Sequence, residues 1–395
     1  MGDEHKQMGV PVLYLDNAAT AYPKPPSVLE RALSTYIERG VSPGRGGYDL
    51  AVEADSLVNE VRRKVARFFG SRDADRVIFT GNATDALNIV LQGLVRPGDH
   101  IVSTRLEHNS VLRPLHHMRG KGIIDYDLVS FDGDGFVNPD EIAEAIRANT
   151  RAVVVSHASN VLGTVQPIGE IGRVCAERSV PLIVDAAQSA GVVPFDMAKW
   201  RVAAVAFTGH KSLMGPTGIG GLVLGPGLDV QTTRFGGTGI DSESPVHTQT
   251  YPYRLEAGTL NLLGIIGLSE GLDYILREGQ GVIHSREMAL LTRLRDGLSG
   301  LDGIKLYCAN DLTRHVALLT ATVRGMNAQD VGTILDADFG IAVRAGLHCA
   351  PLAHAGLGTH PHGGVRFSPG PFTTPGDIDV AIEAMTMIAG AQNRK

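Results

Sequence analysis

The chain has 395 residues, of which 43% are hydrophobic and 20% are charged, the balance of a globular protein with room for two domains. Its formal net charge of −6 argues against nucleic acid as a partner, because nucleic acid binds to basic surfaces. No apolar run approaches the roughly 18 residues that a membrane-spanning helix needs, so we expect no membrane partner.

The three cysteines are too few, and odd in number, for a disulfide framework. Cys175 lies at helical spacing in IGRVCAERS and Cys308 ends a short apolar run, so both are predicted to be small buried hydrophobes. The first ten residues lack the apolar core of a secretory signal. Together these features predict a protein of the reducing cytoplasm.

In chain order, the first strong pattern is an amphipathic stretch over Val52–Phe69 that ends at Gly70, which predicts a helix. From about residue 75 to 225, short apolar runs alternate with helical stretches at Asp85–Val95 and Ile168–Arg178. Such continuously apolar runs predict strands covered on both faces, as in a mainly parallel sheet. The runs are Val77–Thr80, His100–Thr104, Ile123–Val129, Ala152–Ser156, Leu182–Asp185, Val202–Thr208 and Gly220–Leu224. They predict a three-layer α/β fold around a seven-stranded sheet.

A different pattern begins after Thr259. Its predicted elements are helices over Leu262–Arg277, over 284–299 and from Pro375, and short strands near Ile304–Tyr307, Ala317–Val323 and Gly364–Ser368. This mixture predicts a smaller α+β domain. We therefore expect a large α/β domain over residues 21–260 and a small domain over residues 261–395, with residues 1–20 as an N-terminal segment that joins the small domain.

Lys211 follows a buried apolar run and is embedded in small residues, in AFTGHKSLMGPTGIGG (206–221). Lysine is rarely desolvated, and where it is, its pKa falls and the amine becomes a nucleophile for carbonyl compounds. The loop contains no acidic partner, while Thr208, His210 and Ser212 offer groups that bind phosphate. A surface lysine in a glycine-rich turn is the alternative.

Asp185 ends the apolar run of LIVDAAQ (182–188), 26 positions before Lys211. Ligands of α/β sheets gather outside the carboxyl ends of the strands. A carboxylate there can keep a pyridine nitrogen protonated, which lets the ring accept electrons. One strand–helix–strand unit separates the two residues, so both side chains could meet one ring. An aspartate that caps the next helix is the alternative.

A strand, a tight glycine turn and a helix start are predicted in VIFTGNATDA (77–86). The free backbone N–H groups and the helix dipole make this turn a candidate anion site, to which Thr84 adds a hydroxyl. Turns of this kind are common, so ordinary turn chemistry is the alternative.

Taken together, these segments resemble the class V aminotransferase superfamily, and within it the cysteine desulfurases and selenocysteine lyases. The resemblance runs in the family's order from about residue 13 to 375. The matching stretches are YLDNAAT (14–20), FTGNATDA (79–86), EHNSV (107–111), SHASNVLGT (156–164), VDAAQ (184–188), the Lys211 segment (206–221), EAGT (256–259), RAGLHCA (344–350) and VRFS (365–368). The resemblance implies the PLP-dependent transferase fold type I, pyridoxal 5′-phosphate (PLP) as the cofactor, and a homodimer.

The resemblance also implies a role for each matching residue. Lys211 would carry the cofactor as a Schiff base and later move the Cα proton of the substrate. Asp185 would pair with the pyridine nitrogen. His108 would stack on the ring and, with the near-neutral pKa of an imidazole, shuttle the proton of the substrate thiol.

The remaining implied contacts concern the phosphate, the ring oxygen and the substrate. Gln188 and Asn160 would contact the phenolic oxygen of the ring or the substrate. Arg366 would clamp the substrate carboxylate with its bidentate fork, and Arg344 would be a second substrate-binding residue. The residues implied to bind phosphate are Ala83, Thr84, Thr208, His210 and, toward the neighbouring subunit, Thr259.

Cys349 discriminates among the reactions that PLP supports, which the fold alone does not settle. It lies in RAGLHCAP (344–351), where glycine, proline and the neighbouring His348 suit an accessible, activated thiol. A buried inert thiol is the alternative. In the desulfurases this position holds the cysteine that attacks the substrate, so we predict a cysteine desulfurase that converts L-cysteine to L-alanine and takes the sulfur as a persulfide on Cys349. The alternatives are a lyase of L-selenocysteine, another class V reaction on a small amino acid, and a scaffold protein without activity.

Only 17 positions separate Cys349 from Arg366, which is fewer than in desulfurases with a long mobile cysteine loop. A short loop restricts the travel of a persulfide, so we expect a sulfur-acceptor protein or a small-molecule thiol to dock near the site. The same loop contains ligand types that zinc prefers, but their spacing fits no established zinc pattern, and we predict no metal site. These residues are His348, Cys349, His354, His360 and His362.

Overall fold

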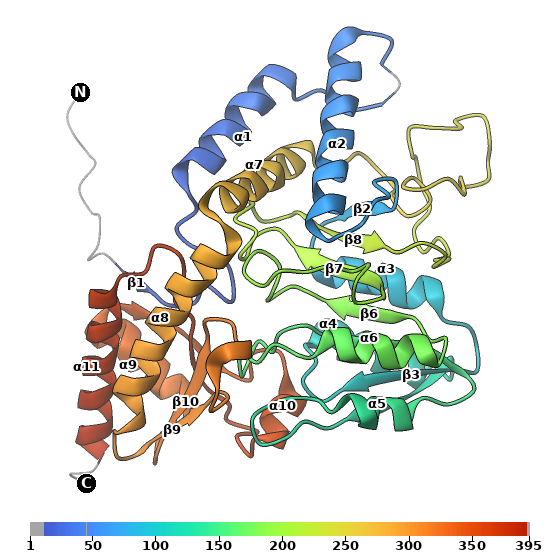
Figure 1. Ribbon diagram of the computed structural model, residues 1–395. Helices are drawn as coiled ribbons and strands as arrows, with labels where there is room; N and C mark the ends of the chain where they lie inside the picture. The colour runs from blue at the N-terminus through green and yellow to red at the C-terminus, as the bar shows by residue number, and fades with distance from the viewer. Residues whose placement is uncertain (1–11, 45, 393–395) are drawn as a thin grey trace, which may run out of the picture.

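The computed structural model describes residues 12–44 and 46–392, and its largest element is a seven-stranded sheet (Figure 1). The strands lie in the order β2–β8–β7–β6–β5–β3–β4. Each lies within two residues of a predicted apolar run, so the predicted sheet is confirmed. The strands are β2 (Val77–Thr80), β3 (Asp99–Thr104), β4 (Ile124–Val129), β5 (Thr150–Ser156), β6 (Leu182–Asp185), β7 (Val202–Thr208) and β8 (Gly220–Leu224).

The sheet is parallel from β4 across to β7, and β8 runs antiparallel to both of its neighbours, β7 and β2. A parallel return needs a crossover of about a dozen residues or more, usually through a helix. The segment between β7 and β8, residues 209–219, contains no helix. The chain therefore reverses there, and the reversing loop contains Lys211.

Helices cover both faces of this sheet, which gives the expected three layers (Figure 1). Alternate residues of a strand point to opposite faces. On β6, Ile183 packs with the apolar cluster of one face, whereas Leu182 and Val184 pack with the cluster of the other. The first face is covered by α3 (Ala83–Leu94) and α4 (Asn109–Gly120), and the second by α2 (Asp49–Phe68), α5 (Pro139–Ala145), α6 (Ile168–Glu177) and α7 (Leu262–Glu278).

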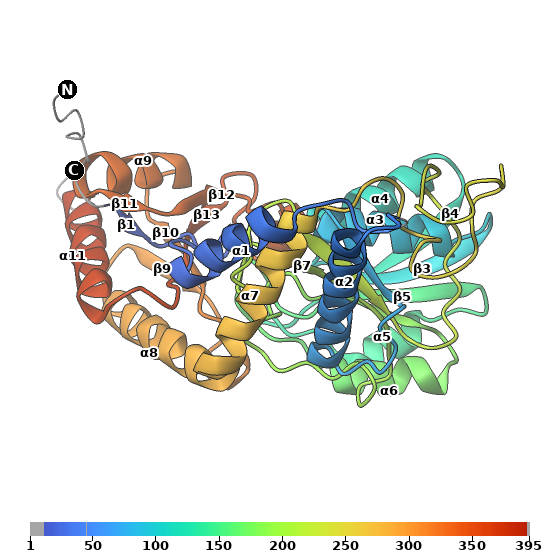
Figure 2. The same ribbon diagram turned by 90° about the horizontal axis from the view of Figure 1, so that it is seen from above.

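A second region follows α7 and has its own sheet and apolar core. Its four strands are antiparallel, in the order β12–β13–β10–β9. Its elements are α8 (Gln280–Ser299), β9 (Ile304–Tyr307), the 3-10 turn η1 (Leu312–Arg314), β10 (Leu319–Val323), α9 (Ala328–Phe339), β11 (Ile341–Ala342), β12 (Arg344–Gly346), α10 (Pro351–Gly356), β13 (Gly364–Phe367) and α11 (Pro375–Gln392). Figure 2 shows this region to the left of the large sheet.

The N-terminal part of the chain belongs to the second region before it crosses to the large sheet. Strand β1 (Leu13–Tyr14) pairs in parallel with β11 (Figure 2). Asp16 forms an isolated bridge with Ser368. Helix α1 (Pro26–Arg39) then packs on α7. Residues 1–11 of the predicted N-terminal segment lie outside the described residues. Within the described ranges, every helix is too short or too polar to cross a bilayer.

Five helices of the described ranges were not predicted from the sequence: α1, α4, α5, α9 and α10. Helix α4 contains Pro114, and a proline inside a pattern argues for a helix end because its ring removes a backbone donor. Here the helix continues through Pro114, since Val111, Leu115 and Met118 pack one face of it into the core.

Candidate active site

A cavity of about 490 Å³ lies at the carboxyl ends of β5, β6 and β7, whose last residues Ser156, Asp185 and Thr208 all line it. Residues of the second region line its other side. Every predicted site residue reaches this cavity except Thr259. The predicted residues that line it are Ala83, Thr84, His108, Asn160, Asp185, Gln188, Thr208, His210, Lys211, Arg344, Cys349 and Arg366.

Lys211 and Asp185 face the cavity from neighbouring strand ends. Burial lowers the pKa of Lys211 to about 8, and burial raises the pKa of Asp185. Each charge favours the ionised form of the other, but the effect of burial is larger at both groups. The Asp185 carboxylate accepts a hydrogen bond from the backbone N–H of Ala187 (2.9 Å), and no direct ion pair with Lys211 is found in the described part of the chain. The amine and the carboxyl can therefore both bind a third group placed between them.

The peptide before Lys211 is fixed by the N-terminal segment. The backbone N–H of Ala21, the hydroxyl of Thr20 and the ammonium of Lys24 all donate to the carbonyl oxygen of His210. Burial lowers the pKa of Lys24 to about 8. The loop that carries Lys211 is thus held by a segment that lies 190 positions earlier in the sequence.

Another part of the cavity is suited to an anion. Asn82 caps the N-terminus of α3 by accepting a hydrogen bond from the Asp85 N–H (3.0 Å), with Ala83 and Thr84 in the first turn. The hydroxyl oxygen of Thr208 and Nδ1 of His210 are buried without a hydrogen-bond partner in the described structure. Buried polar atoms are unfavourable unless bonded. A phosphate group at this helix N-terminus would satisfy them.

His108 is the N-cap residue of α4, and its Nδ1 accepts a hydrogen bond from the Ser110 N–H (3.0 Å). Burial, and then the positive charge of Lys211 and nearby arginines, lower the pKa of His108 to about 4. The structure therefore does not give His108 the near-neutral pKa that was predicted for a proton shuttle. Because Nδ1 accepts, the hydrogen of the neutral ring is on Nε2, which suits hydrogen-bond donation.

Arg366 is oriented by groups from two distant segments. Its Nη2 donates to Oδ1 of Asp16 (2.8 Å), and its Nη1 donates to the carbonyl oxygen of Asn160 (3.1 Å). The arginine is 3% exposed, and its Nε has no partner in the described part of the structure. The guanidinium is thus held in place with a donor left over, an arrangement that suits a carboxylate ligand.

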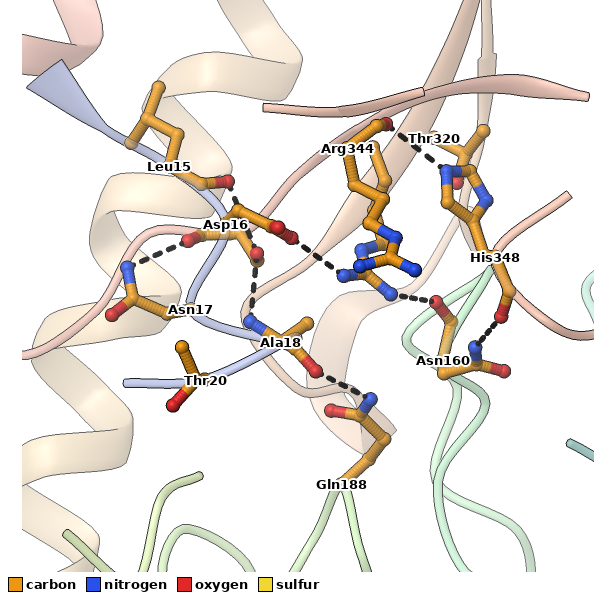
Figure 3. Close-up of polar contacts among 12 residues, drawn as sticks. Leu15, Asp16, Asn17, Ala18, Thr20, Asn160, Gln188, Thr320, Arg344 and His348 are labelled. Atoms are coloured by element: carbon orange, nitrogen blue, oxygen red, sulfur yellow. Dashed lines mark hydrogen bonds and ion pairs between the residues drawn. The ribbon is translucent and has the colours of Figure 1, made fainter. Parts of the chain in front are cut away.

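Cys349 is exposed and lies in a tight turn between the cavity and the surface. His348 and Cys349 have φ angles of 50° and 56°, a left-handed conformation that is strained for residues with a Cβ. Two bonds anchor the turn: Asn160 Nδ2 donates to the carbonyl oxygen of His348 (2.5 Å; Figure 3), and the Asn109 N–H donates to that of Cys349 (2.7 Å). The Asn160 amide predicted to contact the cofactor therefore also holds the cysteine turn.

Cys349 also lines an outer groove of about 670 Å³. The groove shares Arg344, His348 and Cys349 with the inner cavity. Its other lining residues come from the start of α4, the start of α9, β12 with the residue after it, and the loop before β13, and five of these nine residues are exposed. The Cys349 turn is thus the partition between an inner cavity and an open surface groove.

Thr259 lies apart from this arrangement. It lines a separate cavity of about 520 Å³ that shares no residue with the first. A buried ion pair forms part of that cavity, with Arg62 Nη1 and Nη2 donating to Glu256 Oε1 (2.8 Å) and Oε2 (2.6 Å). Within one chain, Thr259 is not brought to the cavity that Lys211 lines.

The remaining cysteines, and the histidines weighed as zinc ligands, lie in surroundings that do not indicate a metal site in the described residues. Cys175 is buried and Cys308 is half-buried, so the predicted burial holds fully only for Cys175. Among the residues that the structure describes, no group of three or more histidine, cysteine or acidic side chains is arranged to hold a metal ion. His348 and His354, two of the residues weighed as ligands, hydrogen bond to each other instead (3.0 Å).

Sequence reasoning missed three polar residues of the site. Asp16 pairs with Arg366. Ser110 bonds to Thr84 (2.6 Å) as well as to His108. Glu107 is fully buried behind the cavity, where it accepts hydrogen bonds from the backbone and hydroxyl of Ser156, and burial raises its pKa to about 7. A signal was available for Asp16 and Glu107, because they lie in two of the stretches that carry the family resemblance, YLDNAAT (14–20) and EHNSV (107–111).

Comparison with known proteins agrees with this geometry. The aminotransferase class-V family profile matches residues 13–380. A probable cysteine desulfurase of Methanothermobacter thermautotrophicus is 36% identical over 400 aligned residues, which cover 99% of each chain. The apo structure of a cysteine desulfurase from Thermococcus onnurineus superposes with a TM-score of 0.90 at 32% identity, covering 96% of this chain and 95% of that one. The cysteine desulfurase CsdA of Escherichia coli superposes with a TM-score of 0.85 at 28% identity, covering 95% and 94%.

Proposed function

The chain belongs to the aminotransferase class-V family, and we propose that within this family it is a PLP-dependent cysteine desulfurase, which converts L-cysteine to L-alanine and takes up the sulfur as a persulfide on Cys349. One observation carries the proposal: an exposed cysteine lines the same cavity as a half-buried lysine and a buried aspartate. Lysine and aspartate suit PLP in general, whereas the cysteine suits sulfur transfer in particular.

The residues present fit PLP as the cofactor. Its phosphate would be held by the α3 N-terminus together with Thr208 and His210, whose buried polar atoms lack partners. Asp185, His108 and Gln188 would contact its ring, and Lys211 would be the amine that carries it; all four residues line the cavity. PLP supplies a ring that accepts the electron pair released when the substrate loses its Cα proton.

The protein's own groups then carry the other tasks. Arg366 holds the substrate carboxylate, since Asp16 and Asn160 already orient its guanidinium. Lys211, with its pKa lowered to about 8, is a usable base for the Cα proton near neutral pH. The Cys349 thiolate attacks the substrate sulfur, so that an S–S bond forms while the Cβ–S bond breaks and its electron pair stays with the carbon fragment.

A homodimer and a two-domain chain are part of the same proposal. Thr259 is proposed to serve the phosphate of a second chain, because its cavity is separate from the one with Lys211. Helix α1 offers an exposed apolar stripe for such an interface, formed by Leu29, Leu33, Tyr36 and Ile37. We propose domain limits near residues 20 and 260; the chain reaches the second sheet only after α7, which packs on the large sheet.

The sulfur is proposed to leave Cys349 through the outer groove. The inner cavity would hold the cofactor and the alanine product, whereas the groove is open and reaches the same thiol. An acceptor protein or a small thiol could approach there without movement of the short loop. The three free cysteines are compatible with the cytoplasm as the compartment.

Turnover of L-cysteine tests the proposal. The wild-type protein, loaded with PLP, is expected to form alanine from L-cysteine in the presence of a thiol reductant. Cys349→Ala should lose this turnover by at least about 10³-fold, because the nucleophile is gone, while it keeps the visible absorbance of bound cofactor. Cys308→Ala, which changes a half-buried thiol outside both the cavity and the groove, is the matched control. Undiminished turnover by Cys349→Ala would remove this cysteine from the mechanism.

A further inference from the structure

The turn that presents Cys349 is unusual because two successive residues with side chains are left-handed, at φ 50° for His348 and 56° for Cys349. Residues with a Cβ adopt this conformation only where surrounding contacts hold them there. The carbonyl groups of both residues are bonded to Asn160 and Asn109 from outside the turn. The side chain of His348 is a further point of attachment.

A chain of hydrogen bonds runs from His348 through His354 to Thr359. His348 Nε2 lies 3.1 Å from the carbonyl oxygen of Arg344 (Figure 3). His348 Nδ1 lies 3.0 Å from His354 Nε2. His354 Nδ1 lies 2.7 Å from the Thr359 hydroxyl. His354 is completely buried in α10, and neither His354 nor Thr359 lines the cavity.

The direction of each hydrogen bond follows from the first acceptor. A carbonyl oxygen only accepts, so His348 Nε2 carries a hydrogen and, in a neutral ring, Nδ1 accepts. His354 must then donate from Nε2, and its own Nδ1 accepts from the Thr359 hydroxyl at 2.7 Å, which is nearer than the second acceptor of that hydroxyl, the His354 carbonyl oxygen at 3.2 Å. Neutral rings agree with the burial of both histidines, which lowers the pKa of His348 to about 2 and that of His354 to about 4. The chain has one consistent direction, from Thr359 to Arg344.

We propose that His354 and Thr359 are positioning residues for the sulfur-transfer step: through His348 they hold the left-handed turn that points the Cys349 thiol at the substrate. This inference rests on the proposed function, but it concerns groups that touch neither cofactor nor substrate. The bond that Cys349 forms with the substrate sulfur requires the reacting atoms to be aligned, and a displacement of about 1 Å can slow such a step about a hundredfold. The chain of neutral imidazoles supplies a fixed and uncharged support for that alignment.

Thr359→Val removes the first donor of the chain at almost constant volume, and Thr359→Ser restores it. The matched control is Thr150→Val, which breaks another histidine–threonine bond, between His100 Nδ1 and the Thr150 hydroxyl (2.9 Å), at the start of β5 and far from the cavity end of that strand. A general loss of stability would affect both valine variants. A positioning role affects only the first.

Two quantities are measured with L-cysteine. Single turnovers give the rate of persulfide formation, and steady-state turnover gives KM. Thr359→Val is expected to form persulfide about 10- to 100-fold more slowly with KM changed less than about twofold. Thr359→Ser and Thr150→Val should stay within about twofold of the wild type in both. His354→Gln, which keeps a donor near the Nε2 position, should lie between the two threonine variants. Persulfide formation at the wild-type rate in Thr359→Val would overturn the proposal.

A second measurement needs no substrate, so it separates this inference from the proposed function. The backbone N–H of Ala350 bonds to the carbonyl oxygen of Leu347 and closes the turn (2.9 Å). Hydrogen exchange of the Ala350 amide should be at least about tenfold faster in Thr359→Val and unchanged in Thr150→Val. If the wild type makes no persulfide but exchange follows this pattern, the function is wrong and the positioning is right. Unchanged exchange at Ala350 in Thr359→Val would contradict the positioning itself.

Discussion

The two sides of the candidate site are built by different means. On the side of the large sheet, Asp185 and Thr208 end regular strands, and Lys211 follows three residues later. On the other side, Cys349 lies in a turn that belongs to no helix or strand. Strand register positions the first group, whereas hydrogen bonds from separate segments position the second.

This difference predicts which substitutions should alter the chemistry of the site and which should alter its geometry. Register in a buried parallel sheet is set by the whole apolar face, so a single polar substitution on the sheet side changes chemistry and leaves geometry intact. The turn has no such support, and its two strained residues rely on a few individual bonds. Substitutions around the turn should therefore change the position of Cys349 while the cofactor side remains as it was.

Lys211→Ala tests the sheet side. The variant loses the amine that carries the cofactor and moves the Cα proton, so alanine formation should fall by at least about 10⁴-fold. Reduction with borohydride followed by mass analysis should attach PLP to the wild type and not to the variant. Retention of a reducible PLP adduct in Lys211→Ala would assign that adduct to another lysine, with Lys24 as the first candidate because its pKa is also lowered.

Asp185→Asn tests the same side with a smaller change. The amide keeps the size of the carboxyl but cannot carry its negative charge, so the ring accepts electrons less readily and turnover should fall by roughly 10²-fold. Persulfide formation and Cα-proton exchange of L-alanine should slow together, because both need the same electron acceptor. If Asp185→Asn slowed persulfide formation but not Cα-proton exchange, Asp185 would act on the Cys349 turn and not on the cofactor.

The strand ends could be predicted from the sequence because an apolar run followed by a polar residue has one physical meaning in a buried sheet. The anchors of the turn could not. Asn109 acts through its backbone N–H, which leaves no trace in the residue type, and Thr359 acts through a histidine. His354 was visible in the sequence, but a cluster of histidines also suits zinc, and only the distances distinguish the two interpretations.

The reversal at β8 and the continuation of α4 through Pro114 also escaped prediction. Both depend on tertiary packing: β8 fills a place between β2 and β7, and α4 buries one face on the sheet. Apolar runs specify that a strand is covered, but not its direction. Asp16 was in a matched stretch, yet its partner Arg366 is 350 positions away.

Glu287 provides a reference outside both sides of the site. It lies on α8, is 5% exposed, and burial raises its pKa to about 8. The unfolded chain loses this proton near pH 4.5 and the folded chain does not until about pH 8, so stability falls as pH rises between these values. Glu287→Gln removes that penalty and should raise the free energy of unfolding at pH 7.5 by on the order of 2 kcal/mol, with turnover unchanged. Denaturant unfolding measures the gain, and a loss of stability would mean that the carboxyl has a role that the amide cannot fill.

His354 gives a pH dependence of opposite sign on the turn side. Burial lowers its pKa to about 4, whereas histidine in an unfolded chain titrates near 6.5. Its contribution to stability is complete above about pH 6.5 and is lost as pH falls toward 4, because the unfolded chain takes up the proton first. In His354→Gln, the slope of unfolding free energy against pH between 4.5 and 6 should decrease by up to about 1.4 kcal/mol per pH unit. An unchanged slope would mean that the imidazole of His354 is solvated.

The most direct test of how the two sides act together is the mass of the protein after one exposure to L-cysteine without a reductant. If a thiol on the turn takes sulfur from a substrate bound on the sheet side, the peptide that contains Cys349 gains one sulfur atom and one alanine is released per site. Alanine release with no added sulfur on Cys349, or with the sulfur on Cys308, would contradict the claim that Cys349 takes the sulfur from a substrate bound on the sheet side.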